Sequence, residues 1–89
     1  MPIKQIFQFS NHAIDQIVAR SLSRQMIEEI LQPKEKKIIK AGNIDIHQKI
    51  VIEIDKPYLY TVFVNNTKKP FLVVTVYKTS KIEKYENQI

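Results

Sequence analysis

The chain has 89 residues, 44% of them hydrophobic and 26% charged, a composition typical of one globular domain spanning residues 1–89. It contains no cysteine, which excludes disulfides, cysteine-ligated metal centres and thiol nucleophiles and fits a reducing compartment. Its only glycine, Gly42, excludes glycine-rich phosphate loops and dinucleotide-binding fingerprints. The sequence has no apolar run of membrane-spanning length and no signal-peptide pattern. We therefore expect a cytoplasmic protein without a membrane partner.

The charge balance is the first positive indication of function. Fourteen lysines and arginines against nine acidic residues give a formal net charge of +5. A small basic domain attracts polyanions. The charge alone leaves nucleic acid, anionic lipid and an acidic protein open as partners.

The N-terminal third predicts a short strand followed by two helices. Residues 3–9 alternate like an edge strand, and Ser10 or Asn11 then offers a side-chain oxygen to cap a first helix that ends near Ser21. Ser23 can cap a second helix, which Pro33 stops. Helical spacing predicts one apolar side on each helix, formed by Ala13, Ile14, Ile17, Val18 and Leu22 in the first and by Met26, Ile27, Ile30 and Leu31 in the second.

After residue 37 the hydrophobic period changes from that of a helix to that of a strand. Strands are predicted at residues 38–41, 44–55, 58–64 and 71–78, with a tight turn at Gly42-Asn43, while the tail from Thr79 is assigned to neither class. The last strand, which combines β-branched and aromatic residues, is the most β-prone segment and is predicted to be central. We expect its Leu72, Val74 and Val76 and the alternating isoleucines 44 to 54 to meet the helices. The predicted fold is α+β: a helical hairpin packed on one face of a four- to five-stranded antiparallel sheet.

Three side chains of the helical region are candidates for chemistry. His12 lies in the first helical turn, where a neutral imidazole is a competent general base and free backbone N–H groups favour an anion. Arg20 lies two turns further along the same polar side, and Arg24 opens the second helix; both suit bidentate contacts to phosphate. The alternative interpretation is an ordinary solvated helix surface.

The strands supply a second set of candidates. Thr75, Tyr77 and Lys78 end the last strand, where hydroxyl, phenol and ammonium groups can bind a phosphate or protonate a leaving oxygen. Ordinary strand composition also explains them. His47 and Lys49 share one side of the second predicted strand and are candidates for binding an RNA backbone. No set of residues has the spacing of a metal site, so no metal or cofactor is predicted.

These residues fall in a recognisable pattern. The pattern consists of Phe9-Ser10-Asn11-His12-Ala13, Arg20, the Met26–Leu31 stretch and Val73-Val74-Thr75-Val76-Tyr77. In these residues the chain resembles a small prokaryotic family catalogued as domain of unknown function 4258. The likeness runs from Phe9 to Lys78. The chain departs from the family pattern at Gln16, near where many members carry an additional arginine.

That family is similar in fold to the RelE-like toxins and to the wider barnase/colicin-type ribonuclease superfamily, whose members are typically metal-independent endoribonucleases. The resemblance implies that His12, Arg20, Thr75 and Tyr77 line one site. It implies RNA as substrate, with an acidic antitoxin protein and the ribosome as further partners. Two alternatives remain: a non-catalytic RNA- or protein-binding module on the same scaffold, and a degenerate domain that only docks an acidic partner.

Overall fold

The computed structural model describes residues 6–32, 36–54 and 56–82, which form an α+β domain with two helices and one five-stranded sheet. In chain order the elements are β1 (Gln8–Phe9), α1 (Asn11–Ala19), α2 (Arg24–Leu31), β2 (Lys37–Ala41), β3 (Ile44–Glu53), β4 (Lys56–Asn65) and β5 (Leu72–Thr79). The predicted α+β class is confirmed. Neither helix in this part of the chain has the length and hydrophobicity needed to cross a membrane. The predicted stop at Pro33 and most of the tail lie outside the described residues.

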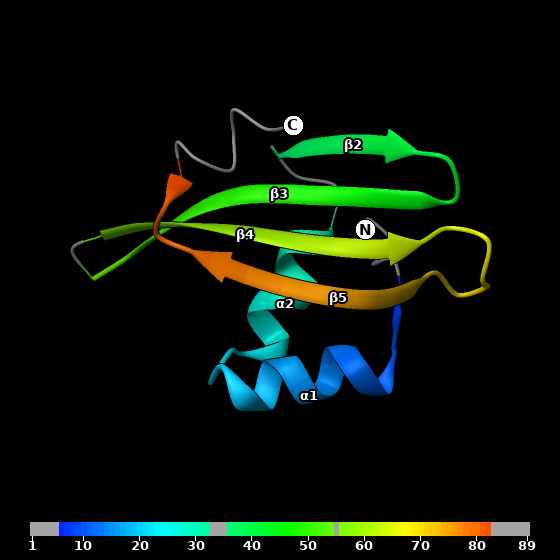
Figure 1. Ribbon diagram of the computed structural model, residues 1–89, viewed down its shortest axis with the longest axis horizontal. Helices are drawn as coiled ribbons and strands as arrows, with labels where there is room; N and C mark the ends of the chain where they lie inside the picture. The colour runs from blue at the N-terminus through cyan, green and yellow to red at the C-terminus, as the bar shows by residue number, and fades with distance from the viewer. Residues whose placement is uncertain (1–5, 33–35, 55, 83–89) are drawn as a thin grey trace, which may run out of the picture.

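The sheet is mixed rather than antiparallel throughout. Its strand order is β1-β5-β4-β3-β2, and Figure 1 shows β4 in the middle. The β2–β3, β3–β4 and β4–β5 pairs are antiparallel, whereas β1 pairs with β5 in parallel, with Gln8 opposite Leu72. The predictions of a purely antiparallel sheet and of a central β5 are therefore wrong. The two helices carry the chain from β1 at one edge of the sheet to β2 at the other, so no hairpin joins β1 to β5 and the pair is free to be parallel.

Serine side chains begin both helices, as the sequence predicts. The Ser10 hydroxyl accepts a hydrogen bond from the Ala13 N–H at 3.0 Å, and the Ser23 hydroxyl accepts one from the Met26 N–H at 3.3 Å. Each bond satisfies a backbone donor that has no partner within the helix. Ser10 also donates to the Val74 carbonyl oxygen at 3.3 Å, so its hydroxyl joins the start of α1 to β5.

This double role leads to a stability prediction. Ser10→Ala is expected to lower the free energy of unfolding by about 1–2 kcal/mol, because it removes a helix cap and a half-buried hydrogen bond to the sheet. Ser23→Ala, which removes an exposed cap alone, should cost less, about 0.5–1 kcal/mol. Urea unfolding of the two variants measures the difference. Equal losses would show that the bond from Ser10 to Val74 contributes nothing.

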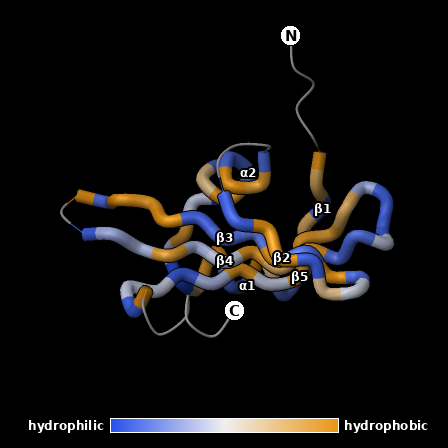
Figure 2. The backbone as a smooth tube through the Cα atoms, turned by 90° about the horizontal axis from the view of Figure 1, so that it is seen from above, coloured by the Kyte–Doolittle hydropathy of each residue, from blue (hydrophilic) through white to orange (hydrophobic). Residues whose placement is uncertain are grey.

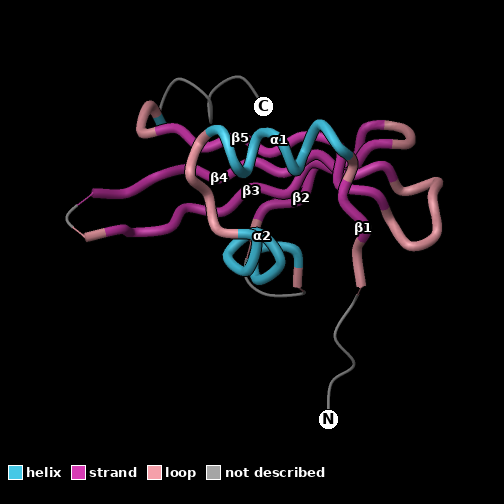
Figure 3. The backbone as a smooth tube through the Cα atoms, turned by 90° about the horizontal axis from the view of Figure 1, so that it is seen from below, coloured by secondary structure: helices cyan, strands magenta, loops and turns pink. Residues whose placement is uncertain are grey.

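The helices take different positions against the sheet. Figures 1 and 3 show α1 running alongside β5, while α2 lies behind the sheet and contacts β3. Between them and the sheet lies the core, which consists of Ala13, Ile17, Ile27, Ile30, Leu31, Tyr60, Val62, Val64, Val73 and Val76. Every one of these side chains is at most 7% exposed. The side of the sheet that carries this core is called the helix side below, and the other the far side.

The isoleucines of β3 face away from the helices, which corrects the sequence prediction. His47 pairs with the core residue Val62 and therefore points to the helix side, so that Ile46 and Ile50 point to the far side. Side chains alternate strictly along a strand, and the alternation alone does not say which set faces inward. Figure 2 shows the hydrophobic end of β3 extending toward the β3–β4 hairpin, where Ile52 is 77% exposed and Ile54 fully exposed.

An irregularity in the β4–β5 pairing corrects the predicted face of β5. The register shifts between Phe63, which pairs with Thr75, and Val64, which pairs with Val73. Val73 and Val76 consequently both enter the core although they are three residues apart. The predicted alternation of Leu72, Val74 and Val76 assumed a regular strand. A bulge of this kind changes the face on which every following side chain lies.

Candidate functional site

Helix α1 is fastened along the outer edge of β5. The Val76 N–H donates a hydrogen bond to Gln16 Oε1 at 2.9 Å, in addition to the bond between Ser10 and Val74 nearer the start of the helix. An edge strand leaves backbone groups without a strand partner, and the Gln16 amide satisfies one of them. Gln16 is therefore a structural residue of this edge. The two contacts set the direction of α1: it runs parallel to the second half of β5.

At the end of α1 an arginine meets a tyrosine of β5. Arg20 is the C-cap residue of the helix, and its guanidinium carbon lies 5.0 Å from the centre of the Tyr77 ring. Tyr77 pairs with Thr61, and Thr75 pairs with Phe63, so both β5 side chains lie on the far side of the sheet. The structure thus brings a cation, a phenol ring and a threonine hydroxyl to one stretch of the β5 edge.

His12 lies on the same side of α1, at the opposite end. It precedes Gln16 by four residues, so its side chain points in nearly the same direction, about 6 Å back along the helix axis. The imidazole is exposed. His12 and Arg20 are about 12 Å apart along the axis. At this separation the two side chains act on one phosphodiester only when both extend toward it from the two ends of the helix.

Lys78 belongs to a second group, on the helix side of the same strand end. Its ammonium nitrogen lies 2.7 Å from Glu53 Oε1, and the Tyr60 hydroxyl donates to Glu53 Oε2. The Lys78 bond lowers the pKa of Glu53, and the same bond raises the pKa of Lys78. Burial, followed by the bond to Glu53, raises the pKa of Tyr60.

Glu53 and Tyr60 are not among the candidates predicted from the sequence. The signal that would have found them is the register that pairs Tyr60 with Lys78 and Glu53 with Lys56, which places all four side chains on one face. Local sequence does not determine that register.

The three other sequence candidates lie apart from Arg20 and Tyr77. Arg24 pairs with Glu28 at 3.1 Å, and its guanidinium carbon lies 4.5 Å from the centre of the Phe9 ring. His47 and Lys49 point to the helix side, and His47 is only 7% exposed. Burial, with a contribution from the charge of Lys36, lowers the pKa of His47 to about 4. An imidazole in this position is neutral and cannot reach an RNA backbone without rearrangement.

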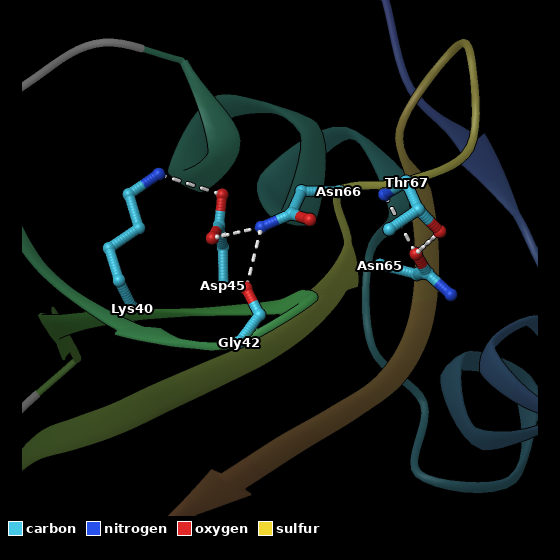
Figure 4. A network of polar contacts seen from close by, with 6 residues as sticks. All are labelled: Lys40, Gly42, Asp45, Asn65, Asn66 and Thr67. Carbon is cyan, nitrogen blue, oxygen red and sulfur yellow. Dashed lines mark hydrogen bonds and ion pairs between the residues drawn. The ribbon is translucent and has the colours of Figure 1, made fainter.

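Figure 4 shows a further polar network, which holds two turns together. The buried Asp45 carboxylate accepts hydrogen bonds from Lys40 Nζ at 2.9 Å and from Asn66 Nδ2 at 2.8 Å. Burial alone would raise the pKa of Asp45, but these two bonds lower it below its ordinary value. Asn66 also reaches the carbonyl oxygen of Gly42, whose φ of 63° suits glycine in the predicted tight turn. Each of the six residues drawn makes at least one contact with another of them, so the network is structural.

No group of three or more His, Asp or Glu side chains that could hold a metal ion occurs within residues 6–32, 36–54 and 56–82. Comparison with protein-family models, with curated proteins and with solved structures gives no match to the chain. The candidate site therefore rests on its own geometry, on the far side of β5 beside α1.

Proposed function

We propose that the chain is an endoribonuclease that cleaves RNA without a metal ion, by attack of a ribose 2′-OH on the adjacent phosphorus. One observation carries the proposal: the Arg20 guanidinium lies 5.0 Å from the Tyr77 ring, in line with His12 and Gln16 along the β5 edge. A strand of RNA laid along this edge would meet an imidazole, a guanidinium and hydroxyl groups in succession. The net charge of +5 adds a general attraction for RNA.

The proposed chemistry assigns one role to each group. His12 accepts the proton of the 2′-OH, whose oxygen bonds to phosphorus as the bond to the 5′-oxygen breaks. An acid, which can be the protonated His12 or Tyr77, gives a proton to the departing 5′-oxygen. Arg20 stabilises the negative charge that accumulates on the phosphate oxygens, and Thr75 orients them. The products are a 2′,3′-cyclic phosphate and a free 5′-hydroxyl.

The proposal includes a RelE-like fold and a place in a toxin–antitoxin pair. Two consecutive helices followed by four antiparallel strands support the fold assignment. The toxin assignment rests on the likeness to domain of unknown function 4258 described above. It predicts a neighbouring gene for a small acidic protein that binds this chain, and it allows cleavage that depends on the ribosome.

The test is cleavage of free RNA by the purified protein in the presence of EDTA, with a separate assay on ribosomes in magnesium-containing buffer. Wild-type protein should produce fragments that end in a cyclic phosphate, and His12→Ala should cut about a hundredfold more slowly, because it lacks the proposed base. Lys68→Ala, which removes one exposed charge from the turn between β4 and β5, serves as the control and should cleave RNA at the wild-type rate.

The outcome also separates the alternative functions. RNA binding of equal strength by wild type and His12→Ala, with no products under any condition, would favour a non-catalytic RNA-binding module. If the chain neither binds nor cleaves RNA but binds an acidic protein tightly, only the alternative of a domain that docks an acidic partner would remain.

A further inference from the structure

The Glu53–Tyr60–Lys78 group has the arrangement of an anion-binding site that is filled by a side chain of the protein itself. Lys78 Nζ donates to one oxygen of the Glu53 carboxylate at 2.7 Å, and the Tyr60 hydroxyl donates to the other. An ammonium and a phenol thus converge on one small oxyanion. Two non-bridging oxygens of a phosphate present the same kind of acceptor pair as the two oxygens of a carboxylate.

Aromatic rings and a second cation surround this pair. Lys78 Nζ lies 4.3 Å from the centre of the Tyr58 ring and 5.5 Å from that of Tyr60, while Lys56 Nζ lies 5.8 Å from the Tyr58 ring. Proteins bind single-stranded nucleic acid with this combination of groups: the ammonium groups contact its phosphates, and the tyrosine rings stack on its bases.

The pair is accessible and weakly held. The side chains of Lys78 and Glu53 are 26% and 29% exposed. The core residue Tyr60 is only 3% exposed, and its hydroxyl, which donates to Glu53, becomes available to a phosphate when the Glu53 carboxylate moves aside. Ion pairs in contact with water contribute little to stability, because both charges are well solvated when apart. A phosphate can therefore replace the Glu53 carboxylate at small cost.

We propose that Lys78, Tyr60 and Tyr58 bind one nucleotide of a single-stranded RNA, with Lys78 and Tyr60 on its phosphate, and that the Glu53 carboxylate occupies the phosphate position in the free protein. The inference rests on the proposed function for the identity of the polymer. It adds a phosphate contact on the helix side of β5, opposite the Arg20–Tyr77 contact. The Glu53 side chain competes with RNA for the same two donors.

The test measures, by fluorescence anisotropy at several salt concentrations, how tightly the protein binds a short single-stranded RNA. The RNA carries 2′-O-methyl groups, which prevent its cleavage. Glu53→Gln is expected to tighten binding about threefold, the effect of removing one exposed competing ion pair. Lys78→Gln is expected to weaken binding and to reduce the slope of log K against log salt by about 0.7, the value for one phosphate contact with a single strand.

The matched control is Glu29→Gln, which removes the same charge from the exposed surface of α2. Glu29→Gln should tighten RNA binding less than Glu53→Gln does. In the double variant with Lys78→Gln, Glu53→Gln should tighten binding no more than Glu29→Gln does. Equal tightening by the two glutamate variants, or tightening that persists without Lys78, would overturn the inference. Circular dichroism of each variant checks that the fold is kept.

Two further arms identify the ligand and separate the two proposals. Inorganic phosphate should compete with the RNA only weakly; if it competes as well as a ribonucleotide does, the site binds free phosphate and not RNA. Because the RNA cannot be cleaved, tightening by Glu53→Gln would support this site even if no nuclease activity were found. Normal cleavage of unmodified RNA with no binding effect of Glu53 or Lys78 would remove the site and leave the nuclease proposal standing.

Discussion

Replacing Arg20 with alanine is expected to lower the rate of RNA cleavage by about a hundredfold or more, the usual effect of removing one preorganised donor from the charge that develops in a transition state. Two features set the position of Arg20. It caps the end of α1 and lies 5.0 Å from the Tyr77 ring, so its guanidinium is held before RNA arrives. The rate constant should fall much more than the affinity, because the contact is strongest in the transition state.

Conservative variants distinguish this role from a general effect of charge. Arg20→Lys keeps the positive charge but loses the planar pair of donors, and it should recover only a small part of the rate. Tyr77→Phe keeps the ring beneath the guanidinium and should retain the affinity for RNA while losing any proton that the phenol supplies. Arg20 is exposed, so its removal should leave the urea midpoint nearly unchanged. Full activity of Arg20→Ala would contradict the proposed site.

The local features of the fold were predictable because short segments encode them. Ser10 and Ser23 begin the helices as expected, since a serine ahead of an amphipathic stretch satisfies the free N–H groups of the first turn. The turn at Gly42 and the β3–β4 hairpin also follow from composition and alternation. Each of these features depends only on residues close together in the sequence.

The errors concern relations between distant segments. The outward direction of Ile46 and Ile50 depends on which side of β3 the helices cover, and the bulge opposite Val64 depends on the pairing of β4 with β5. The parallel pairing of Gln8 with Leu72 joins segments 64 residues apart. The contact between Glu53 and Lys78 has the same origin, because it forms only when β3, β4 and β5 are in register. Hydrophobic period is a local property and contains no information on these pairings.

The position of Arg20 beside Tyr77 is also a tertiary property. It requires α1 to run parallel to β5, which the bonds of Ser10 and Gln16 to the β5 backbone enforce. Gln16 departs from the family pattern, and in the structure its amide accepts a hydrogen bond from the β5 edge. A polar residue on the exposed side of an amphipathic helix gives no local sign of such a role.

The second large effect is a loss of stability in weak acid that comes from one buried histidine. His47 is 7% exposed, its ring meets Phe7 edge-on with centroids 6.5 Å apart, and its Nδ1 has no hydrogen-bond partner within the described residues. Burial and the nearby charges of Lys36 and Lys40 lower its pKa from 6.5 to about 4, although Asp45 opposes this shift. The folded protein therefore binds a proton at His47 more weakly than the unfolded chain does.

The sign of the pH dependence follows from that difference. Above pH 6.5 the imidazole is neutral in both states and contributes nothing, whereas between about pH 6.5 and about pH 4 protonation favours the unfolded chain. The free energy of unfolding should fall by about 2 kcal/mol between about pH 7 and about pH 5, and by about 3 kcal/mol once the pH is below 4. The lowered pKa values of Asp45 and Glu53 reduce stability only as the pH falls below the ordinary values of 3.8 and 4.5, so the loss between about pH 7 and about pH 5 is that of His47.

Urea unfolding across this range, with matched variants, tests the assignment. The chain has two histidines, and His12→Gln, which removes the exposed one, should keep the full acid-induced loss. His47→Gln and His47→Phe should both abolish it, whatever their stability near neutral pH, because neither side chain takes up a proton there. The imidazole resonances of the folded wild type provide an independent measure, with the signal of His47 expected to titrate near pH 4. An acid-induced loss that survives in both His47 variants would mean that the proton is bound elsewhere.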